Sequence, residues 1–298
     1  MSEVSVPGAV KADTNVFAKT ERKGRRPNVP GVIGTVFTLL MAAVWIFPLY
    51  WAVVTSLKRE NDVLANPPSW LPIPLTFDAY RTVLTESGLL RWYWNSVFTG
   101  VIITFVVVLL CMMCAYAISQ LSFPGKNLLF WTLLAGFMIP GQALTVPQFI
   151  LMNDLNAVNT YAGIILPQLI APVVIIIYKQ FFDAVPGELH DAAVIDGAGE
   201  GRILFNIFLP INWGITWALA IVTFIGAWNA FFWPFIITSS ENMMTIPVGI
   251  TQVNDAFGVQ YARTMAVAVL AGLPVVVAYL AFQNRVTEGI MATAGLKG

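Results

Sequence analysis

The sequence predicts an all-α polytopic membrane protein with six transmembrane helices. Two observations lead to this fold class. Of the 298 residues, 57% are hydrophobic and only 11% are charged, and the mean hydropathy is +0.74, far more apolar than a soluble domain. Six apolar runs also reach the roughly 20 residues that a helix needs to cross a hydrocarbon core about 30 Å thick.

The six predicted spans contain no Asp, Glu, Lys, Arg or His in their interiors. They are residues 32–56, 95–121, 128–152, 161–182, 209–238 and 263–283. Basic residues precede the first run, as they do in a signal peptide. This run is longer than a signal-peptide core of roughly 7 to 15 residues and lacks a small-residue cleavage site after it, so we interpret it as the first span.

The basic residues set the predicted orientation. An even number of spans places both termini on one side, and eleven Lys and Arg residues fall on that side against five on the other. Because basic residues accumulate in cytoplasmic segments, both termini are expected in the cytoplasm. Residues 1–30 are polar and basic without apolar periodicity, so they are expected to be a disordered cytoplasmic tail.

The remaining chain divides into three parts by this topology. Residues 31–91 are expected to hold the first span and an extracytoplasmic loop rich in Pro and Trp, and residues 92–285 a core of five helices. Within that core, residues 183–210 are expected to form a cytosolic loop. The third part, residues 286–298, is expected to be a cytoplasmic C-terminal tail.

Several patterns exclude chemistry within the chain itself. Cys111 and Cys114 form a CMMC inside the second span, where two small apolar core residues are expected rather than a redox or metal site. The spans lack the ionisable group with which ion-coupled transporters handle their ion. The Gly125-Lys126 pair lacks the rest of a phosphate-binding loop. We therefore expect no catalytic residues, no metal and no cofactor on this chain, and energy supplied through a cytosolic contact.

The best candidate for that contact is the polar stretch VPGELHDAAVIDGAGEGRILFNIFLP, residues 185–210. Pro186 suits the first turn of a helix, and Glu188 and Asp191 then lie near the positive end of its dipole. Asp196-Gly197 predicts the helix end, with Gly197 at positive φ. A second helix is expected from Glu200 to the next span, so the stretch is a helix, a turn and a helix.

One face of the first helix is expected to approach a partner closely. Leu189, Ala192, Ala193 and Asp196 follow the i, i+3, i+4, i+7 spacing of a single face, and the alanines are small. The alternative is an amphipathic helix at the lipid headgroups. Such helices are usually basic with bulky apolar residues, whereas this one is acidic, which favours docking to a protein. His190 is expected to be a solvated surface histidine without chemistry.

At these residues the sequence resembles the EAA motif of ABC importer permeases. The motif positions are occupied by Asp191, Ala192, Ala193, Asp196, Gly197, Ala198, Leu209 and Pro210. Asp191 stands where the family usually has Glu. Further ordered segments, including AYAISQLSFPGK, IPGQALTVPQF and GAWNAFFWPFI, extend the resemblance over nearly the whole chain, to the second permease subunit of maltose-type carbohydrate importers.

The resemblance implies a type I ABC importer permease fold and a multi-pass position in a prokaryotic inner membrane. It also implies a heterodimer with another permease, two cytosolic ATPase subunits that use the ATP, and an extracytoplasmic sugar-binding protein, with no nucleic acid. The EAA segment would be the coupling helix that docks on an ATPase. Its implied ATPase-coupling residues are Glu188, Asp191, Ala192, Ala193, Asp196, Gly197, Ala198 and Pro210. The terminal AGLKG resembles a tail that reaches toward the ATPases in some relatives.

A sugar path is expected where helices are interrupted at membrane depth, because the freed backbone groups then meet water or ligand. Proline and glycine indicate such breaks in the third, fourth and fifth spans. Neutral amides and aromatic faces near them are the candidate path residues: Asn229, Trp228, Gln142, Gln168 and Phe231. The alternatives are interface anchors for the aromatic residues and interhelical hydrogen bonds for the amides.

Two functions of different class remain open at this point. The first is the permease subunit of an ATP-driven importer of a sugar or polyol. The second is an ion-coupled secondary transporter or passive facilitator that acts without an ATPase. The cytosolic segment favours the first, and the lack of charge within the spans disfavours the second.

Overall fold

The computed structural model describes residues 29–253 and 259–293. These residues form helices, and none of them lies in a strand. The chain divides into two compact units, residues 1–48 and 49–298, and each is described by itself. The expected N-terminal tail lies outside the described residues up to position 28. The expected C-terminal tail begins as helix and only its last five residues lie outside.

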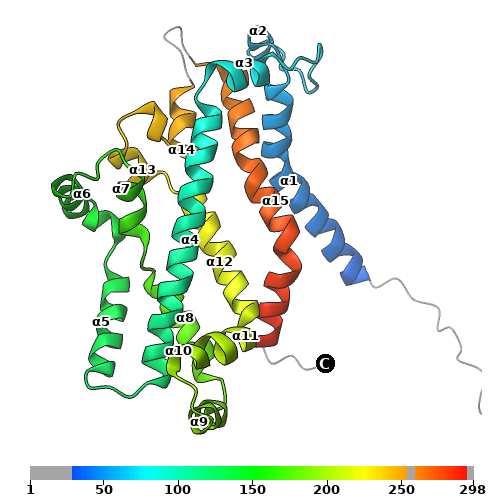
Figure 1. The fold of residues 1–298 in the computed structure, drawn as a ribbon. Helices are drawn as coiled ribbons and strands as arrows, with labels where there is room; N and C mark the ends of the chain where they lie inside the picture. Colours follow the sequence, from blue (N-terminus) through cyan, green and yellow to red (C-terminus); the bar gives the residue numbers. More distant parts are fainter. Residues whose placement is uncertain (1–28, 254–258, 294–298) are drawn as a thin grey trace, which may run out of the picture. The chain divides into compact units, whose positions relative to one another are not determined.

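The helices before the α9 loop include two long ones, α1 and α4, and several short pieces (Figure 1). They are α1 (Val29–Ser56), α2 (Glu60–Val63), α3 (Asp78–Glu86), α4 (Leu89–Gln120), α5 (Lys126–Met138), η1 (Gly141–Leu144), α6 (Thr145–Asp154), α7 (Tyr161–Ile165), η2 (Leu166–Gln168) and α8 (Pro172–Asp183).

The second half of the chain begins with the expected loop helix and ends in the longest helix. The elements are α9 (Gly187–Ile195), α10 (Glu200–Ile203), the π-helical turn η3 (Leu204–Phe208), α11 (Leu209–Ile211), α12 (Trp213–Trp228), α13 (Phe232–Ile237), η4 (Glu241–Met243), α14 (Ile246–Gly249), η5 (Ile250–Gln252) and α15 (Tyr261–Thr293).

Two uninterrupted helices are long and apolar enough to cross a bilayer, Ile33–Ser56 within α1 and the whole of α4. Three bent pairs reach this length together: α5 with Gly141–Asp154 at 95°, Tyr161–Gln168 with α8 at 46°, and Glu200–Ile211 with α12 at 86°. α15 contributes a shorter apolar stretch, Tyr261–Val277. The described residues therefore offer up to five spans by length and composition, and the count of six stays a prediction.

The expected breaks in the third and fourth spans are confirmed. Pro140 caps η1 where the third span turns, and Pro172 begins α8 after the break in the fourth. In the fifth span α12 ends at Trp228 and α13 begins at Phe232. Proline produces such breaks because it lacks the backbone N–H that continues a helix and its ring displaces the preceding turn.

The helix within the predicted fifth span, α12, begins at Trp213, after a bend of 86° that follows residue 211. Pro210 cannot donate to the carbonyl four residues earlier, and the turn before it widens so that Leu209 N donates to Leu204 O, five residues back. Asn212 is buried at the 86° bend, where its Nδ2 donates to Phe208 O at 2.9 Å. Residues 209–211 therefore belong to the helix that follows α9.

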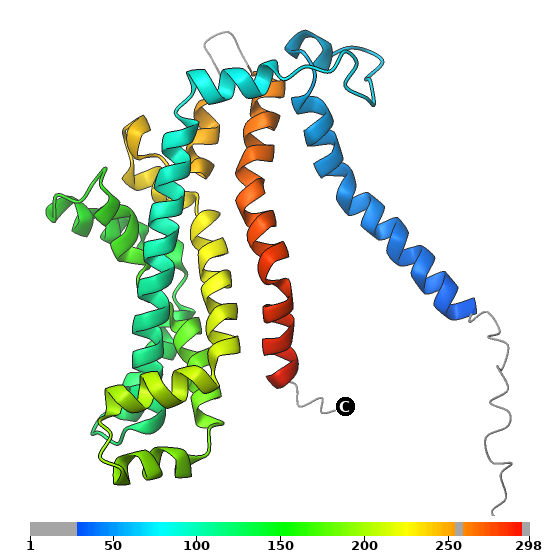
Figure 2. The ribbon, with the colours of Figure 1, turned by 45° about the vertical axis from the view of Figure 1, so that its right-hand side comes forward.

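The core of residues 49–298 is built around α4. Helices α8 and α12 pack against α4, and α15 packs against α12 (Figure 2). The largest cluster of buried apolar residues joins α4 and α8 to the segment from α9 to η3. Cys111 is buried in this cluster with a free thiol, and Cys114 is half-buried, so their prediction as core residues is confirmed.

Helices α2 and α3 lie at the opposite end of this unit from α9 (Figure 1). Here Glu60 accepts hydrogen bonds from the backbone N–H groups of Tyr261 at 2.5 Å and Ala262 at 3.0 Å, which caps the start of α15. Lys58 is buried beside Trp51 and its Nζ donates to Ser69 O at 2.5 Å. Burial lowers the pKa of Lys58.

Candidate functional site

The candidate site is the α9 loop, residues 183–210, which projects beyond the helix bundle (Figure 2). α9 ends in a Schellman motif: Ala198 N donates to Ala193 O at 2.9 Å and Gly197 N donates to Val194 O at 3.0 Å. Gly197 has φ of 77°, as the motif requires. The predicted helix end and the start of the second helix at Glu200 are both confirmed.

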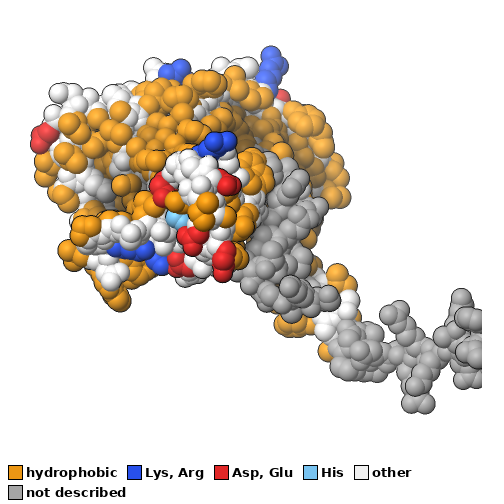
Figure 3. All heavy atoms as spheres, turned by 60° about the horizontal axis from the view of Figure 1, so that its bottom comes forward, with side chains coloured by type: hydrophobic (Ala, Val, Ile, Leu, Met, Phe, Trp, Pro, Cys, Tyr) orange, Lys and Arg blue, Asp and Glu red, His pale blue; other side chains and the backbone are white. Residues whose placement is uncertain are grey.

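The outer surface of α9 combines apolar and acidic side chains. Ile195 is 86% exposed, and Leu189 and Val194 are also exposed although they are apolar. Figure 3 views this end of the molecule and shows acidic side chains gathered on it, with hydrophobic side chains between them and the single histidine among them. A group of exposed apolar side chains rimmed by polar ones is typical of a protein-docking surface.

The predicted face of α9 is divided. Ala193 is only 7% exposed and packs in the core cluster with Phe182 and Phe208, whereas Leu189 and Ala192 are exposed. Successive helix residues lie about 100° apart, so Ala192 and Ala193 can face opposite surroundings. The interpretation of Ala193 as part of the partner-facing surface is therefore wrong. It brings α9 close to its own protein.

His190 is also not the solvated residue that we expected. Its side chain is only 17% exposed, and its Nε2 lies 3.3 Å from Glu200 Oε2. Tyr116 near the end of α4 donates a 2.6 Å hydrogen bond to the same carboxylate oxygen. The other ring nitrogen, Nδ1, lies 3.6 Å from Asp191 Oδ1. Sequence spacing could not reveal this environment, because Tyr116 and Glu200 are 84 positions apart.

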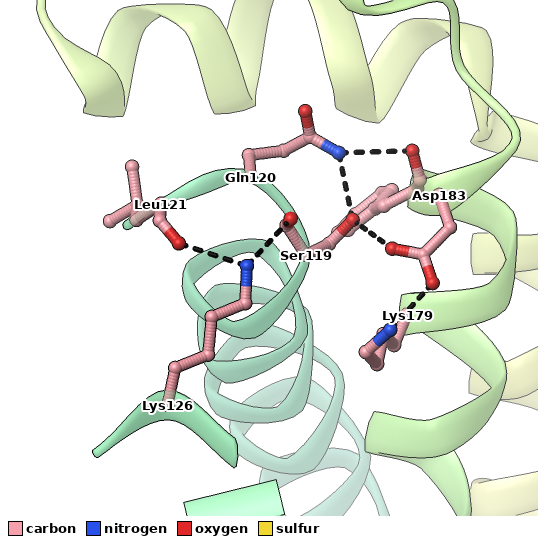
Figure 4. A network of polar contacts seen from close by, with 7 residues as sticks. Ser119, Gln120, Leu121, Lys126, Lys179 and Asp183 are labelled. Atoms are coloured by element: carbon pink, nitrogen blue, oxygen red, sulfur yellow. Dashed lines mark hydrogen bonds and ion pairs between the residues drawn. The ribbon is translucent and has the colours of Figure 1, made fainter. Parts of the chain in front are cut away.

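The entry to α9 is held by a polar network between α4 and α8 (Figure 4). Ser119 Oγ donates to Asp183 Oδ1 at 2.6 Å, and Lys179 Nζ donates to Asp183 Oδ2 at 2.6 Å. Gln120 Nε2 donates to Phe182 O at 3.1 Å. The last turn of α8 is therefore bonded to the last turn of α4 directly before the α9 loop begins.

The same network includes Lys126 at the start of α5. Its Nζ donates to Ser119 O at 3.1 Å and to Leu121 O at 3.0 Å (Figure 4). These carbonyls lack helical partners at the end of α4, and an ammonium group satisfies them where the helix dipole is negative. The sequence pattern around Gly125-Lys126 did not indicate this role, because it depends on where α4 ends relative to α5.

The candidate path residues lie at the helix breaks but in different environments. Asn229 is exposed, with Nδ2 donating to Ile225 O at 2.9 Å, and Phe231 is exposed and stacked on Phe235 at 5.2 Å. Gln142 is exposed, and Gln168 is half-buried.

Trp228 is not available to a ligand in this structure. It is 2% exposed, and its indole N–H donates to Ala271 O at 3.2 Å. Tyr93 and Phe224 pack against its ring. The prediction of Trp228 as a path residue is therefore wrong, because the contact with α15 that buries it depends on residues far away in the sequence.

A family model described as the binding-protein-dependent transport system inner membrane component matches residues 108–290, more than half of the chain. The chain belongs to this family. Family membership makes the chain a transport component of a membrane rather than an enzyme. It also implies that the chain acts together with a partner permease, an ATPase and a binding protein. This disfavours the alternative of an ion-coupled transporter.

Named relatives match almost the whole permease. The arabinooligosaccharides transport system permease protein AraQ of Halalkalibacterium halodurans is 33% identical over 267 residues, which are 89% of this chain and 95% of the relative. The diacetylchitobiose uptake system permease protein NgcG of Streptomyces coelicolor is 29% identical, over 87% of this chain and 86% of the relative. The sn-glycerol-3-phosphate transport system permease protein UgpE of Brucella abortus is 29% identical, over 90% and 98%.

A solved structure shares the fold of the permease. It is a chain of a bacterial ABC transporter involved in the import of the acidic polysaccharide alginate. The TM-score is 0.79 at 21% identity, and the match covers 89% of this chain and 99% of that chain. The all-α fold of an ABC importer permease is thus confirmed.

Proposed function

We propose that this permease carries a sugar or related polyol across a prokaryotic inner membrane, driven by ATP hydrolysis on separate ATPase subunits. The names of the relatives support the substrate class, since arabinooligosaccharides, diacetylchitobiose and glycerol 3-phosphate all present several hydroxyl groups. An extracytoplasmic binding protein delivers the substrate. The assembly contains a second, different permease and two ATPases, and both termini of this chain lie in the cytoplasm.

In this proposal α9 is the coupling helix. The observation that carries the proposal is the group of exposed apolar side chains on a capped helix outside the candidate spans, formed by Leu189, Val194 and Ile195. Glu188, Asp191, Ala192 and Asp196 are exposed around it and would contact the ATPase. The remaining motif residues position the helix: Ala193 and Ala198 by packing, Gly197 by its positive φ, and Pro210 at the junction with α12.

The substrate path in this proposal passes the helix breaks. Asn229 and Phe231 lie at the gap between α12 and α13, and both side chains are exposed. An amide and an aromatic face provide the neutral hydrogen bonds and the apolar contact that a sugar ring needs. Gln142 and Gln168 offer further amides at the breaks of the third and fourth spans.

The docking role of α9 is tested by Ile195→Asp. A charge in place of an apolar docking side chain is expected to reduce ATPase copurification with the tagged permease at least about tenfold, as for a central interface residue. Ile195→Leu is expected to copurify the ATPase as the wild type does. The control is Ile73→Asp, because Ile73 is also highly exposed but lies at the opposite end of the molecule. Wild-type permease that never copurifies an ATPase, or equal recovery with Ile195→Asp, would contradict the proposal.

A second measurement separates the two function classes. In proteoliposomes that contain the assembled subunits, substrate uptake is expected to require ATP and both ATPase subunits. Uptake by the permease alone, driven by an ion gradient or by the substrate gradient, would favour a secondary transporter or facilitator instead.

A further inference from the structure

The carboxylate of Glu200 joins three parts of the permease that are separate in sequence. It begins α10, accepts a hydrogen bond from Tyr116 on α4, and lies against His190 on α9. A neutral imidazole with its proton on Nε2 can donate this hydrogen bond to the carboxylate, and so can an imidazolium. The contact between His190 and Glu200 therefore does not require a charged histidine. One oxygen, Oε2, thus holds α9 and α4 together.

Tyr116 is a rigid anchor for this contact. Its side chain is 3% exposed, and its ring packs edge-to-face on Phe182 at 6.2 Å and on Phe208 at 5.2 Å. Phe182 lies in α8, before helix α9, and Phe208 lies in η3, after helix α9. The ring of Tyr116 is therefore held by residues that precede and follow α9.

The contact differs from the packing of α9. Ala193 fixes how close α9 lies to the core, but a methyl group of this size does little to fix the rotation of a helix about its own axis. His190 lies three positions earlier, nearly one turn away, and its contact with Glu200 supplies a second point of attachment. The two contacts, together with the chain connections at both ends of α9, restrict how the helix can turn.

We propose that Glu200 is a positioning residue that ties the orientation of the coupling helix to α4. This inference rests on the proposed function of α9. A movement imposed on α9 by an ATPase is transmitted through His190 and Glu200 to Tyr116, and so to the helix around which the core is built. Without the contact, α9 still folds and docks, but part of its movement is absorbed within the loop.

Glu200 and Tyr116 can be substituted in ways that are expected to leave the fold intact. Glu200 is 47% exposed, so water replaces a lost partner at small cost. Tyr116→Phe removes only the hydroxyl and keeps both ring contacts. The matched control is Tyr178→Phe, a fully buried tyrosine on α8 whose hydroxyl lies near Thr216 of α12 rather than near Glu200.

The readout is the amount of substrate taken up per ATP hydrolysed, measured in proteoliposomes with the assembled transporter. Tyr116→Phe, Glu200→Ala and His190→Leu are each expected to lower this ratio about fivefold, with ATPase copurification unchanged. Glu200→Gln and His190→Gln keep an acceptor and a donor, and are expected to restore much of it. Tyr116→Phe combined with Glu200→Ala is expected to be no worse than Glu200→Ala alone, because both remove the same contact.

Three outcomes would overturn the inference. Unchanged ratios in all three variants, with normal wild-type coupling, would reject Glu200 as a positioning residue and leave the proposed function intact. Loss of ATPase copurification in Tyr116→Phe but not in Tyr178→Phe would assign Tyr116 a structural role only. Wild-type permease without ATP-dependent uptake would reject the proposed function and the inference with it.

Discussion

At the scale of single residues, the turn of the α9 loop depends on the backbone conformation of Gly197. Its φ of 77° lies in the left-handed region, which L-residues with branched side chains avoid at a cost of roughly 1–2 kcal/mol. An added Cβ would meet no atom within 4 Å. A substitution at this position therefore acts through the backbone alone, and the side chain itself fits without a clash.

Substitutions of Gly197 can therefore test the backbone conformation of the turn separately from side-chain packing. Gly197→Val is expected to destabilise the turn by about 1–2 kcal/mol and to lower uptake per ATP hydrolysed, while Gly197→Asn, which tolerates left-handed φ, stays near wild type. The matched control is Gly199→Val, since Gly199 has φ of −76° and equally open space around it. Equal effects of valine at both positions would show that the backbone conformation of Gly197 does not matter.

At the scale of elements, α4 carries polar contacts at both ends. Near one end it holds the α9 loop through Tyr116 and Ser119. Near the other, the fully buried Asn95 donates from Nδ2 to Asn242 O and Met244 O, both at 2.8 Å, and accepts from Tyr161 Oη at 2.7 Å. A buried amide with its donors satisfied is stable only while every partner stays in place.

The hydrogen bonds of Asn95 predict that a substitution of similar size at this position strongly lowers the stability of the permease. Asn95→Asp would turn a carboxylate oxygen toward two backbone carbonyls, so it is expected to destabilise the permease by about 3 kcal/mol or more. Thr99→Val removes a hydroxyl bonded only within its own helix and is expected to cost about 1 kcal/mol. Thermal unfolding in detergent measures both. Similar melting temperatures for the two variants would contradict the importance of this network.

At the scale of the whole molecule, the ends of residues 49–298 differ in chemistry. One end carries α2, α3 and the buried Lys58, and the other carries the acidic α9 loop (Figure 1). The proposed orientation, with both termini in the cytoplasm, would place α9 on the cytosolic side, where an ATPase can reach it, and α3 on the side of the binding protein.

This orientation can be checked in intact cells with a membrane-impermeant maleimide. Glu86→Cys at the end of α3 is expected to react from outside, whereas Ile195→Cys is expected to react only after permeabilisation. Wild-type permease serves as the control for Cys111 and Cys114, which are buried and half-buried. Labelling of Ile195→Cys from outside would reverse the orientation.

Much of this architecture follows from local chemistry in the sequence. Apolar runs predict helices that cross a bilayer, proline predicts where those helices break, and Asp196-Gly197 predicts where α9 ends. Each of these signals lies within one continuous segment of the chain. The expected loop helix and its C-terminal cap were therefore found without knowledge of any contact.

The sequence by itself thus determined the membrane class, the helix breaks and the α9 loop, because hydropathy and backbone restrictions belong to individual residues. Only the tertiary structure decided which side chains face each other. It buried Trp228 under α15, turned Ala193 inward and brought His190 to Glu200 and Tyr116. Burial and hydrogen bonds depend on residues far apart in the sequence; Tyr116 and Glu200, for example, are 84 positions apart. No local sequence pattern predicts that two such residues meet.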